Sequence, residues 1–289
     1  MDDTNKKAIG DCLQQLHQVL TDHFDLDPSL NLSMQPSLSL RSLVESGISK
    51  RTDFPLIRSK TALLIIDVQE WCNNDPDVPD EYQPALTRML GNISKMLPVF
   101  RQWRDHCEND NSENTTTTIS SAEEKGNTGG SCTTTGCEVI FCAIQSMTND
   151  GRDVSLDYKL SGPSFVNLPK VHTPIHEIFP KQLQPDLHTG KGDIVITKTA
   201  CNVFTSTNLD YILRNLNVEQ IVVCGQYTEQ CVESAVRHAA DLGYFVTVVE
   251  DACASPTQDR HYRGLQGMKG FCRIISTDQV ITELNNAKN

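Results

Sequence analysis

The 289-residue sequence predicts an α/β fold, namely a three-layer, doubly wound sheet of about six mainly parallel strands with helices on both faces. Short apolar runs such as 61–67 and 220–225 are typical of strands that are buried on both faces. These runs alternate about six times with longer segments of helical character. Helical connections between successive strands imply parallel pairing through right-handed crossovers.

The chain divides into an N-terminal extension, 1–60, and one main domain, 61–289. The extension begins with a predicted helix at 5–23, where Ile and Leu recur at helical spacing, and continues as a Pro/Ser-rich loop. Within the main domain, residues 108–136 are low in complexity and contain almost nothing that a core could bury. We therefore predict a disordered surface insertion at 108–136.

The main domain begins with a predicted strand at 61–67, and its remaining elements follow from apolar periodicity. The segment 151–192 is irregular and rich in Pro and His, so no regular element is predicted there. The predicted strands after the first are 138–144, 193–197, 220–225, 244–252 and 271–276, and the predicted helices are 82–105, 204–216, 229–242, 257–269 and a C-terminal helix.

Composition excludes several classes of function. The formal net charge is −12 and no cluster of Lys and Arg is visible, which disfavours nucleic acid and anionic membranes as partners. No apolar run approaches the roughly 18 residues of a membrane span, and the first residues lack the apolar core of a signal peptide. The 11 cysteines are scattered singly, which favours free thiols in a reducing compartment, and we expect a cytoplasmic protein.

Two predicted strands end in residues that can carry chemistry. Active sites of open parallel sheets lie beyond the carboxyl ends of the strands. Asp67 ends the run LLIID, and Lys198 ends the run DIVITK. Taken alone, Asp67 also fits a turn-forming or helix-capping residue, and Lys198 also fits a surface lysine.

The stretch GQYTEQCVESAVRHAADLGY places Cys231 where the chain turns from a strand into a helix. A helix N-terminus carries partial positive charge and free N–H groups, and both lower the pKa of a thiol. The same N–H groups can hold the oxyanion that forms when a thiolate attacks a carbonyl. Cys231 is therefore a candidate nucleophile, and the alternative is a structural thiol like the other ten cysteines.

Three motifs in this order resemble the isochorismatase-like cysteine hydrolase superfamily. They are LLIIDVQ, then VITKTACNVFTSTNLDYILRNLNVEQIVVCG, then QYTEQCVESAVRHAADLGYFVTVVEDACAS. The resemblance covers roughly residues 60–106 and 138–276 and is strongest over 183–254. It implies the isochorismatase-like hydrolase fold and, since family members often form dimers or tetramers, a homo-oligomer.

The resemblance also implies a Cys-Lys-Asp triad, in which Asp67 is the general base, Lys198 its cationic partner and Cys231 the nucleophile. It further implies a non-proline cis peptide between Gln226 and Tyr227, and an oxyanion hole formed by the N–H groups of Tyr227 and Cys231. Retention of the cysteine favours a metal-independent hydrolase that cleaves a C–N bond of a small amide, ureide or carbamoyl compound through a thioester. The alternatives are a true isochorismatase, which releases pyruvate from a vinyl ether, and a catalytically silent member that binds a ligand.

The expected site contains neither a metal nor a cofactor. Nicotinamidases of this superfamily carry an Asp-x-His…His metal site soon after the first catalytic acid, but the corresponding stretch WCNNDPDVPDEYQP contains no histidine. The pair His172 and His176 has helical i, i+4 spacing, yet the intervening Pro174 disfavours a regular helix. We therefore expect no metal and a substrate other than nicotinamide.

Five further residues are candidates for contact with a small-molecule substrate. Gln69 and Trp71 follow Asp67 on the same loop. Tyr227 lies in the turn between Gly225 and Cys231, which we call the nucleophile turn. Phe204 and Thr207 form a Phe-x-x-Thr pattern that opens the helix after the lysine. Packing is the alternative for Trp71, and a core position is the alternative for Phe204.

Overall fold

The computed structural model of the chain describes residues 54–73, 79–109, 137–160, 167–188 and 191–287. All of them belong to one structural unit, Gly47–Asn289. The helix expected at 5–23, nearly all of the N-terminal extension 1–60 and most of the insertion expected at 108–136 lie outside the described residues. Those expectations remain predictions.

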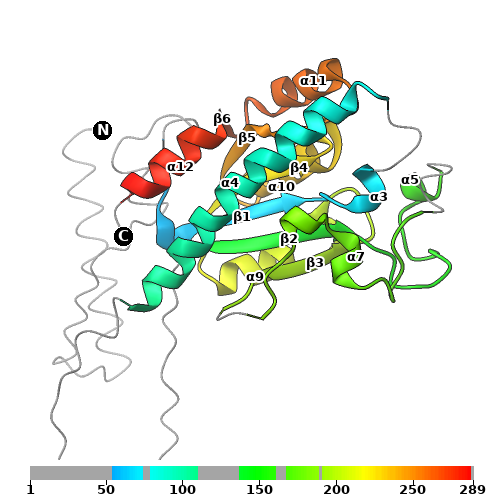
Figure 1. Cartoon of the computed structure of the whole chain (residues 1–289), viewed down its shortest axis with the longest axis horizontal. Coiled ribbons are helices and arrows are strands. Elements are labelled where there is room, and N and C mark those ends of the chain that lie inside the picture. The colour runs from blue at the N-terminus through cyan, green and yellow to red at the C-terminus, as the bar shows by residue number, and fades with distance from the viewer. Residues whose placement is uncertain (1–53, 74–78, 110–136, 161–166, 189–190, 288–289) are drawn as a thin grey trace, which may run out of the picture. The chain divides into compact units, whose positions relative to one another are not determined.

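Six parallel strands form one sheet in the order β3-β2-β1-β4-β5-β6, which confirms the predicted fold class (Figure 1). Each strand begins within one residue or two of its predicted position, because uninterrupted runs of β-branched and aliphatic residues leave little freedom in where a buried strand can lie. The strands are β1 (Thr61–Ile66), β2 (Glu138–Ile144), β3 (Ile194–Lys198), β4 (Gln220–Gln226), β5 (Phe245–Ala254) and β6 (Arg273–Ile275).

Helices cover both faces of the sheet. The long helix α4 (Tyr82–Asn109) packs on one face together with α12 (Thr277–Asn286). Helix α10 (Glu233–Asp241) packs on the opposite face, against α8 (Val203–Ser206) and α11 (Gln258–Met268). The resulting helix–sheet–helix arrangement is the three-layer structure that the sequence predicts.

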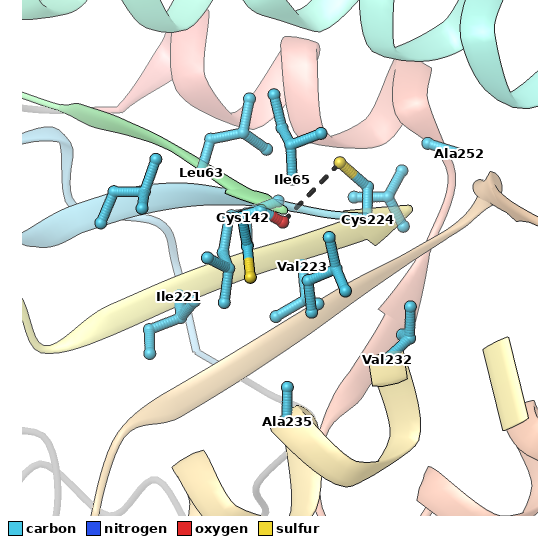
Figure 2. Close-up of a cluster of buried hydrophobic side chains, with 14 of the residues drawn as sticks. Leu63, Ile65, Cys142, Ile221, Val223, Cys224, Val232, Ala235 and Ala252 are labelled. Atoms are coloured by element: carbon cyan, nitrogen blue, oxygen red, sulfur yellow. Dashed lines mark hydrogen bonds between the residues drawn. The ribbon is translucent and has the colours of Figure 1, made fainter. Parts of the chain in front are cut away.

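The core lies on both sides of the central strands (Figure 2). Leu63 and Ile65 of β1 point towards α4, whereas Ile221 and Val223 of β4 point towards α10. All four side chains are at most 1% exposed. Burying a side chain of this size contributes about 1.5–3 kcal/mol to folding, so the alternation along these two strands fixes which face each helix covers.

The single helix predicted at 204–216 is wrong, because the structure divides it into α8 (Val203–Ser206) and α9 (Leu209–Asn215). The backbone is extended at Thr207. Its hydroxyl donates to the Val203 carbonyl at 2.7 Å and accepts the Leu209 N–H at 3.1 Å. A threonine that satisfies the free N–H at the start of a helix favours a new N-terminus over continuation.

The remaining described elements are short. The segment 151–192, where no regular element is predicted, holds a few single turns. Within the described ranges, no helix combines the length and apolar character that crossing a bilayer requires. The short elements are η1 (Arg58–Lys60), α3 (Glu70–Asn73), α5 (Leu156–Lys159), α7 (Ile175–Ile178), η2 (Lys181–Leu183) and η3 (Thr228–Val232).

The strand order places a topological switch point between β1 and β4. From β1 the chain moves outward to β2 and β3, then returns to form β4 on the other side of β1 and continues to β5 and β6. Loops that leave β1 and β4 therefore turn away from each other. A crevice at the carboxyl ends of the two strands is the usual ligand site in such a sheet.

Candidate active site

The three predicted catalytic side chains come from three different strand ends. Asp67 directly follows β1, and Lys198 is the last residue of β3. Cys231 lies in η3, a π-helical turn that follows β4 and leads into α10. Because all six strands are parallel, these ends lie at one edge of the sheet, next to the switch point.

The side chains of Asp67, Lys198 and Cys231, which we call the candidate triad, meet in the interior. Lys198 Nζ lies 2.9 Å from Asp67 Oδ2 and 3.3 Å from Cys231 Sγ. The three residues are 1%, 0% and 5% exposed, respectively. Lys198 is thus not the surface lysine that its position alone also allowed, and its ammonium group links the carboxyl group to the thiol.

Lys198 reaches the other two residues across an intervening strand. β2 lies between β3 and β1, and its register pairs Ile144 with Lys198 and Cys142 with Ile66. The Asp67 N–H donates to the Cys142 carbonyl at 2.9 Å, which ties the loop after β1 to β2. Burial, and after it the charge of Asp67, raises the pKa of the Cys142 thiol, so this neighbouring cysteine stays protonated.

Four oxygen groups surround the ammonium group of Lys198. Besides Asp67, they are the carbonyls of Ala200 and Cys201, each at 3.0 Å, and the hydroxyl of Tyr158 at 3.1 Å. Burial lowers the pKa of Lys198, but the charges of Asp67 and Cys231 raise it more, and the pKa lies well above its usual value. The lysine therefore remains a cation at neutral pH.

The acid and the thiol of the candidate triad are both harder to ionise than in water. Burial raises the pKa of Asp67 well above its usual value, against the opposing effect of Lys198. Contact with Cys201 and burial raise the pKa of Cys231, again against the effect of Lys198. A carboxylate with a raised pKa is a stronger base, and a thiol with a raised pKa keeps its proton until a base removes it.

A glycine allows β4 to approach β1 just before the nucleophile turn. Gly225 pairs with Ile66 and has a φ of +119°. A Cβ atom at position 225 would lie 2.1 Å from the Ile66 carbonyl oxygen. Both the conformation and the close approach require glycine, so this position determines how near Cys231 can come to the end of β1.

The nucleophile turn is held from both sides. The peptide bond between Gln226 and Tyr227 is cis, at the position that the family resemblance implies. The Gln226 side-chain amide donates to the Asp67 carbonyl at 2.8 Å. On the other side, the Thr228 N–H donates to the Ser255 hydroxyl at 3.1 Å. The first of these hydrogen bonds links the backbone of Asp67 to the turn that bears the thiol, and the second links that turn to the residue after β5.

Two residues in contact with Cys231 are not among those that the motifs identify. The Tyr158 hydroxyl lies 3.6 Å from Cys231 Sγ, and Cys201 Sγ lies 3.7 Å from it. Cys201 follows Lys198 by three residues, so its place beside a strand end is a signal that sequence reasoning can use. Tyr158 belongs to α5 in the irregular segment 151–192, where no pattern distinguishes it.

An open depression adjoins the candidate triad on the side of these two residues. Arg237, which lines the depression, is paired with Glu233 at 2.8 Å. Tyr158 and Cys201 contact the Cys231 sulfur and also line the depression, so a small molecule in it can contact the two side chains that touch the thiol. The other residues of its lining include Ala200, Asn202, Gln230 and Ser234.

The structure gives Gln69 and Trp71, which are predicted to contact substrate, contacts within the protein instead. Gln69 is 0% exposed, and its side-chain amide bonds both the N–H and the carbonyl of Ile144, at 2.6 and 3.0 Å. It therefore joins the end of β1 to the end of β2. Trp71 lies in α3 and packs on a small apolar cluster that includes Ile144 and Val154, in agreement with the packing alternative.

Phe204 and Thr207 also make structural contacts. Phe204 is 8% exposed, and its ring centroid lies 5.6 Å from that of His238 and 6.2 Å from that of Tyr244. The Thr207 hydroxyl accepts the Leu209 N–H at the start of α9, as described above. Tyr227 is partly buried in the nucleophile turn, and its ring packs edge-on against Tyr82. None of these residues lines the depression beside the thiol.

The histidine pair does not share a helix. α7 (Ile175–Ile178) begins after Pro174, so His172 precedes the helix and His176 lies within it. His176 is exposed and lies 3.7 Å from Glu177. Among the residues that the structure describes, no group of three or more His, Cys, Asp or Glu side chains is arranged to hold a metal ion.

Several curated proteins are similar to this chain, and two of them serve as examples. Uncharacterized isochorismatase family protein YddQ of Bacillus subtilis is 32% identical over 97 residues, which are 30% of this chain and 54% of YddQ. Ureidoacrylate amidohydrolase RutB of Agrobacterium fabrum is 41% identical over 113 residues, which are 35% of this chain and 48% of RutB. The chain thus spans about half the length of the curated relatives it matches.

Solved structures share the fold. A cysteine hydrolase from Pseudomonas syringae pv. phaseolicola has a TM-score of 0.57 and 20% identity, with 82% of this chain and 98% of that chain covered. An isochorismatase family protein from Burkholderia thailandensis has a TM-score of 0.56 and 23% identity, with 81% and 100% covered. The family model described as the Isochorismatase domain matches residues 61–279, which include the whole candidate triad. The chain therefore belongs to the isochorismatase family.

Proposed function

We propose that this protein is a metal-independent cysteine hydrolase that cleaves a C–N bond of a small amide, ureide or carbamoyl compound through a thioester. One observation carries the proposal: the Lys198 ammonium group lies between the Asp67 carboxyl group and the Cys231 thiol, at 2.9 and 3.3 Å. Nucleophile, base and cation are thus supplied by the chain itself. The similarity to a relative named ureidoacrylate amidohydrolase agrees with this substrate class.

The first half of the reaction forms the thioester. Asp67, whose pKa is raised by burial, accepts the proton of the Cys231 thiol. The sulfur attacks the substrate carbonyl, and the C–O double bond becomes a tetrahedral oxyanion. The oxyanion then collapses, the C–N bond breaks, and the leaving amine departs with the proton from Asp67.

The second half releases the acid. Asp67, again ionised, accepts a proton from a water molecule as the water oxygen attacks the thioester carbonyl. The C–S bond breaks, the acid leaves, and the proton held by Asp67 returns to the Cys231 sulfur. The same carboxyl group therefore acts as base and acid twice in one cycle.

Lys198 and the nucleophile turn stabilise the charges that appear in these steps. The Lys198 cation is 3.3 Å from Cys231 Sγ, so it stabilises the thiolate at the moment of attack. We assign the oxyanion hole to the N–H groups of Tyr227 and Cys231, because both lie in the turn that presents the sulfur. The Tyr158 hydroxyl, 3.6 Å from the sulfur, supplies a further donor for the thiolate.

A trapping experiment tests the proposal. The purified protein is incubated with a panel of small amides, ureides and carbamoyl compounds, ammonia release is measured, and acid-quenched samples are analysed by mass spectrometry. We expect one substrate class to release ammonia and to leave an acyl group on Cys231. Cys231→Ala should abolish both signals. Cys272→Ser is the matched control, because the serine hydroxyl can replace the hydrogen bond that the Cys272 thiol donates to the Met268 carbonyl.

Retention of full amidase activity by Cys231→Ala would refute the mechanism. Pyruvate release from isochorismate, without acylation of Cys231, would instead identify a vinyl ether hydrolase. Turnover of neither class, with Cys231 resistant to alkylation until denaturation, would identify a silent ligand-binding member of the family.

A further inference from the structure

A second thiol touches the proposed nucleophile, and the mechanism above does not use it. Cys201 Sγ lies 3.7 Å from Cys231 Sγ. A disulfide bond is about 2.05 Å long, so the two sulfurs must approach by about 1.6 Å to bond. Rotation of side chains within a loop supplies a movement of this size, since Cys201 lies in the bend between β3 and α8.

The loop that carries Cys201 is fixed beside the nucleophile. Lys198 Nζ donates to the carbonyls of Ala200 and Cys201, both at 3.0 Å, and also contacts Cys231 Sγ. One buried cation therefore holds the backbone at position 201 and the sulfur at position 231 together. The thiol–thiol contact is thus a property of the site rather than of a freely moving side chain.

The two thiols differ in access. Cys201 is partly exposed and lines the open depression, whereas Cys231 is 5% exposed and lies behind it. Hydrogen bonding to Cys231, and also the charge of Lys198, lowers the pKa of Cys201 against the effect of burial. Peroxides react with thiolates that are accessible, so a small oxidant in the depression meets Cys201 first.

We propose that Cys201 and Cys231 form a reversible disulfide in response to a hydroperoxide, and that this disulfide switches off the proposed hydrolase. The inference rests on the proposed function only for its consequence, the loss of activity. The bond itself depends on the contact between the two sulfurs.

The oxidation proceeds in two balanced steps. The Cys201 thiolate attacks hydrogen peroxide, the O–O bond breaks, and the products are a Cys201 sulfenic acid and hydroxide, which takes up the thiol proton to become water. Cys231 then gives its proton to the departing hydroxyl group, and its sulfur attacks the Cys201 sulfur. The S–O bond breaks, a second water leaves, and the disulfide forms. A dithiol reductant reverses the change by thiol–disulfide exchange.

Peptide mapping of the full chain detects this bond without any assay of turnover. After treatment with hydrogen peroxide and alkylation of free thiols, cleavage after Lys and Arg yields peptides 199–214 and 215–237. The second peptide also contains Cys224, so further cleavage after Glu229 is needed to assign the cross-link to Cys231. We expect a cross-linked species that is two hydrogens lighter than the sum of the two reduced peptides and that disappears with dithiothreitol.

Three forms of the protein are compared. In the wild type, hydrolase activity and the alkylation of Cys231 should both decrease as the cross-link forms. Both should recover when dithiothreitol is added. Cys201→Ser should form no cross-link and should be inactivated about tenfold more slowly, because the exposed thiol is gone. Cys272 is a buried cysteine whose thiol bonds the Met268 carbonyl, and the variant Cys272→Ser should behave like the wild type.

Two results would overturn the inference. The first is oxidation of Cys231 to the sulfinic or sulfonic acid in the wild type with no link to Cys201, and the second is a cross-link from either residue to a different cysteine. If the protein hydrolyses none of the compounds tested, the cross-link and the alkylation of Cys231 still report on the disulfide. Failure of the proposed function is therefore distinguished from failure of the disulfide proposal.

Discussion

The Lys198 ammonium group lies 3.3 Å from the Cys231 sulfur, although the two residues are 33 positions apart in the sequence and two strands lie between β3 and β4, which lead to them. β2 and β1 lie between β3 and β4, and the lysine side chain reaches over their carboxyl ends. The same ammonium group is paired with Asp67 at 2.9 Å. A single buried cation therefore connects the ends of three strands, and its removal affects charge, hydrogen bonding and folding together.

Replacement of this cation is expected to inactivate the protein. Lys198→Met keeps the length of the side chain but leaves the buried Asp67 carboxyl group without its partner, and we expect a loss of about 3–5 kcal/mol in stability. Activity should fall by about 100-fold or more, because the base and the thiolate both lose their counter-charge. Thermal unfolding and kcat/KM provide the measurements, with the exposed Lys95→Ala as control. Full activity in Lys198→Met would contradict the assigned role.

The glycine before the nucleophile turn gives a test of backbone geometry. Gly225→Ala places a Cβ atom 2.1 Å from the Ile66 carbonyl oxygen at a φ of +119°, so the end of β4 must move away from β1. We expect a large fall in melting temperature and loss of activity. Gly91→Ala is the matched control, because the space around Gly91 in α4 is open and alanine favours a helix by up to about 1 kcal/mol. Equal melting temperatures for both variants would show that β4 and β1 are not held this closely.

Tyr158 provides a test of a contact that only the fold reveals. Tyr158→Phe removes the hydroxyl that lies 3.1 Å from Lys198 Nζ and 3.6 Å from Cys231 Sγ, and it keeps the ring. We expect kcat to fall about tenfold, which corresponds to about 1.4 kcal/mol of lost transition-state stabilisation. The melting temperature should change little. The exposed Tyr211→Phe serves as control, and an unchanged kcat for Tyr158→Phe would exclude the hydroxyl from the reaction.

The pH profile should reveal the burial of Asp67. Burial raises the pKa of this carboxyl group well above its usual value, and below that pKa it is protonated and cannot accept the thiol proton. Activity should therefore fall on acidification at a pH well above the ordinary aspartate pKa of about 4. A plot of kcat/KM against pH measures the acid limb.

The control for this profile is Asp259→Asn, which changes an exposed carboxyl group paired with Arg263 and should leave the acid limb in place. The contribution of Asp67 to the stability of the fold changes with pH in the opposite direction to the activity. Because its folded pKa is raised, this group stabilises the fold at pH below its unfolded value, and the contribution is lost as the pH rises through the folded value. An acid limb near pH 4 would show that Asp67 does not act as the buried base.

The amino-acid sequence by itself determined the strands, their parallel pairing and the positions of the candidate triad. β2 runs from Glu138 to Ile144, as predicted, because a run of seven residues that can be buried on both faces fits a parallel strand and little else. Asp67 and Lys198 could be singled out because each interrupts an apolar run at the end of a strand. These signals are local in the sequence, and local signals survive folding.

Only the tertiary structure decided which of the neighbouring polar and aromatic residues face the thiol. Gln69 and Phe204 lie close in sequence to Asp67 and Lys198, yet their side chains bond β2 and pack against α10. Tyr158 and Cys201, which no periodic pattern marks, contact the sulfur instead. The physical reason is that such contacts form between segments far apart in the chain. They depend on strand order and on how closely the strands approach, which no single segment encodes.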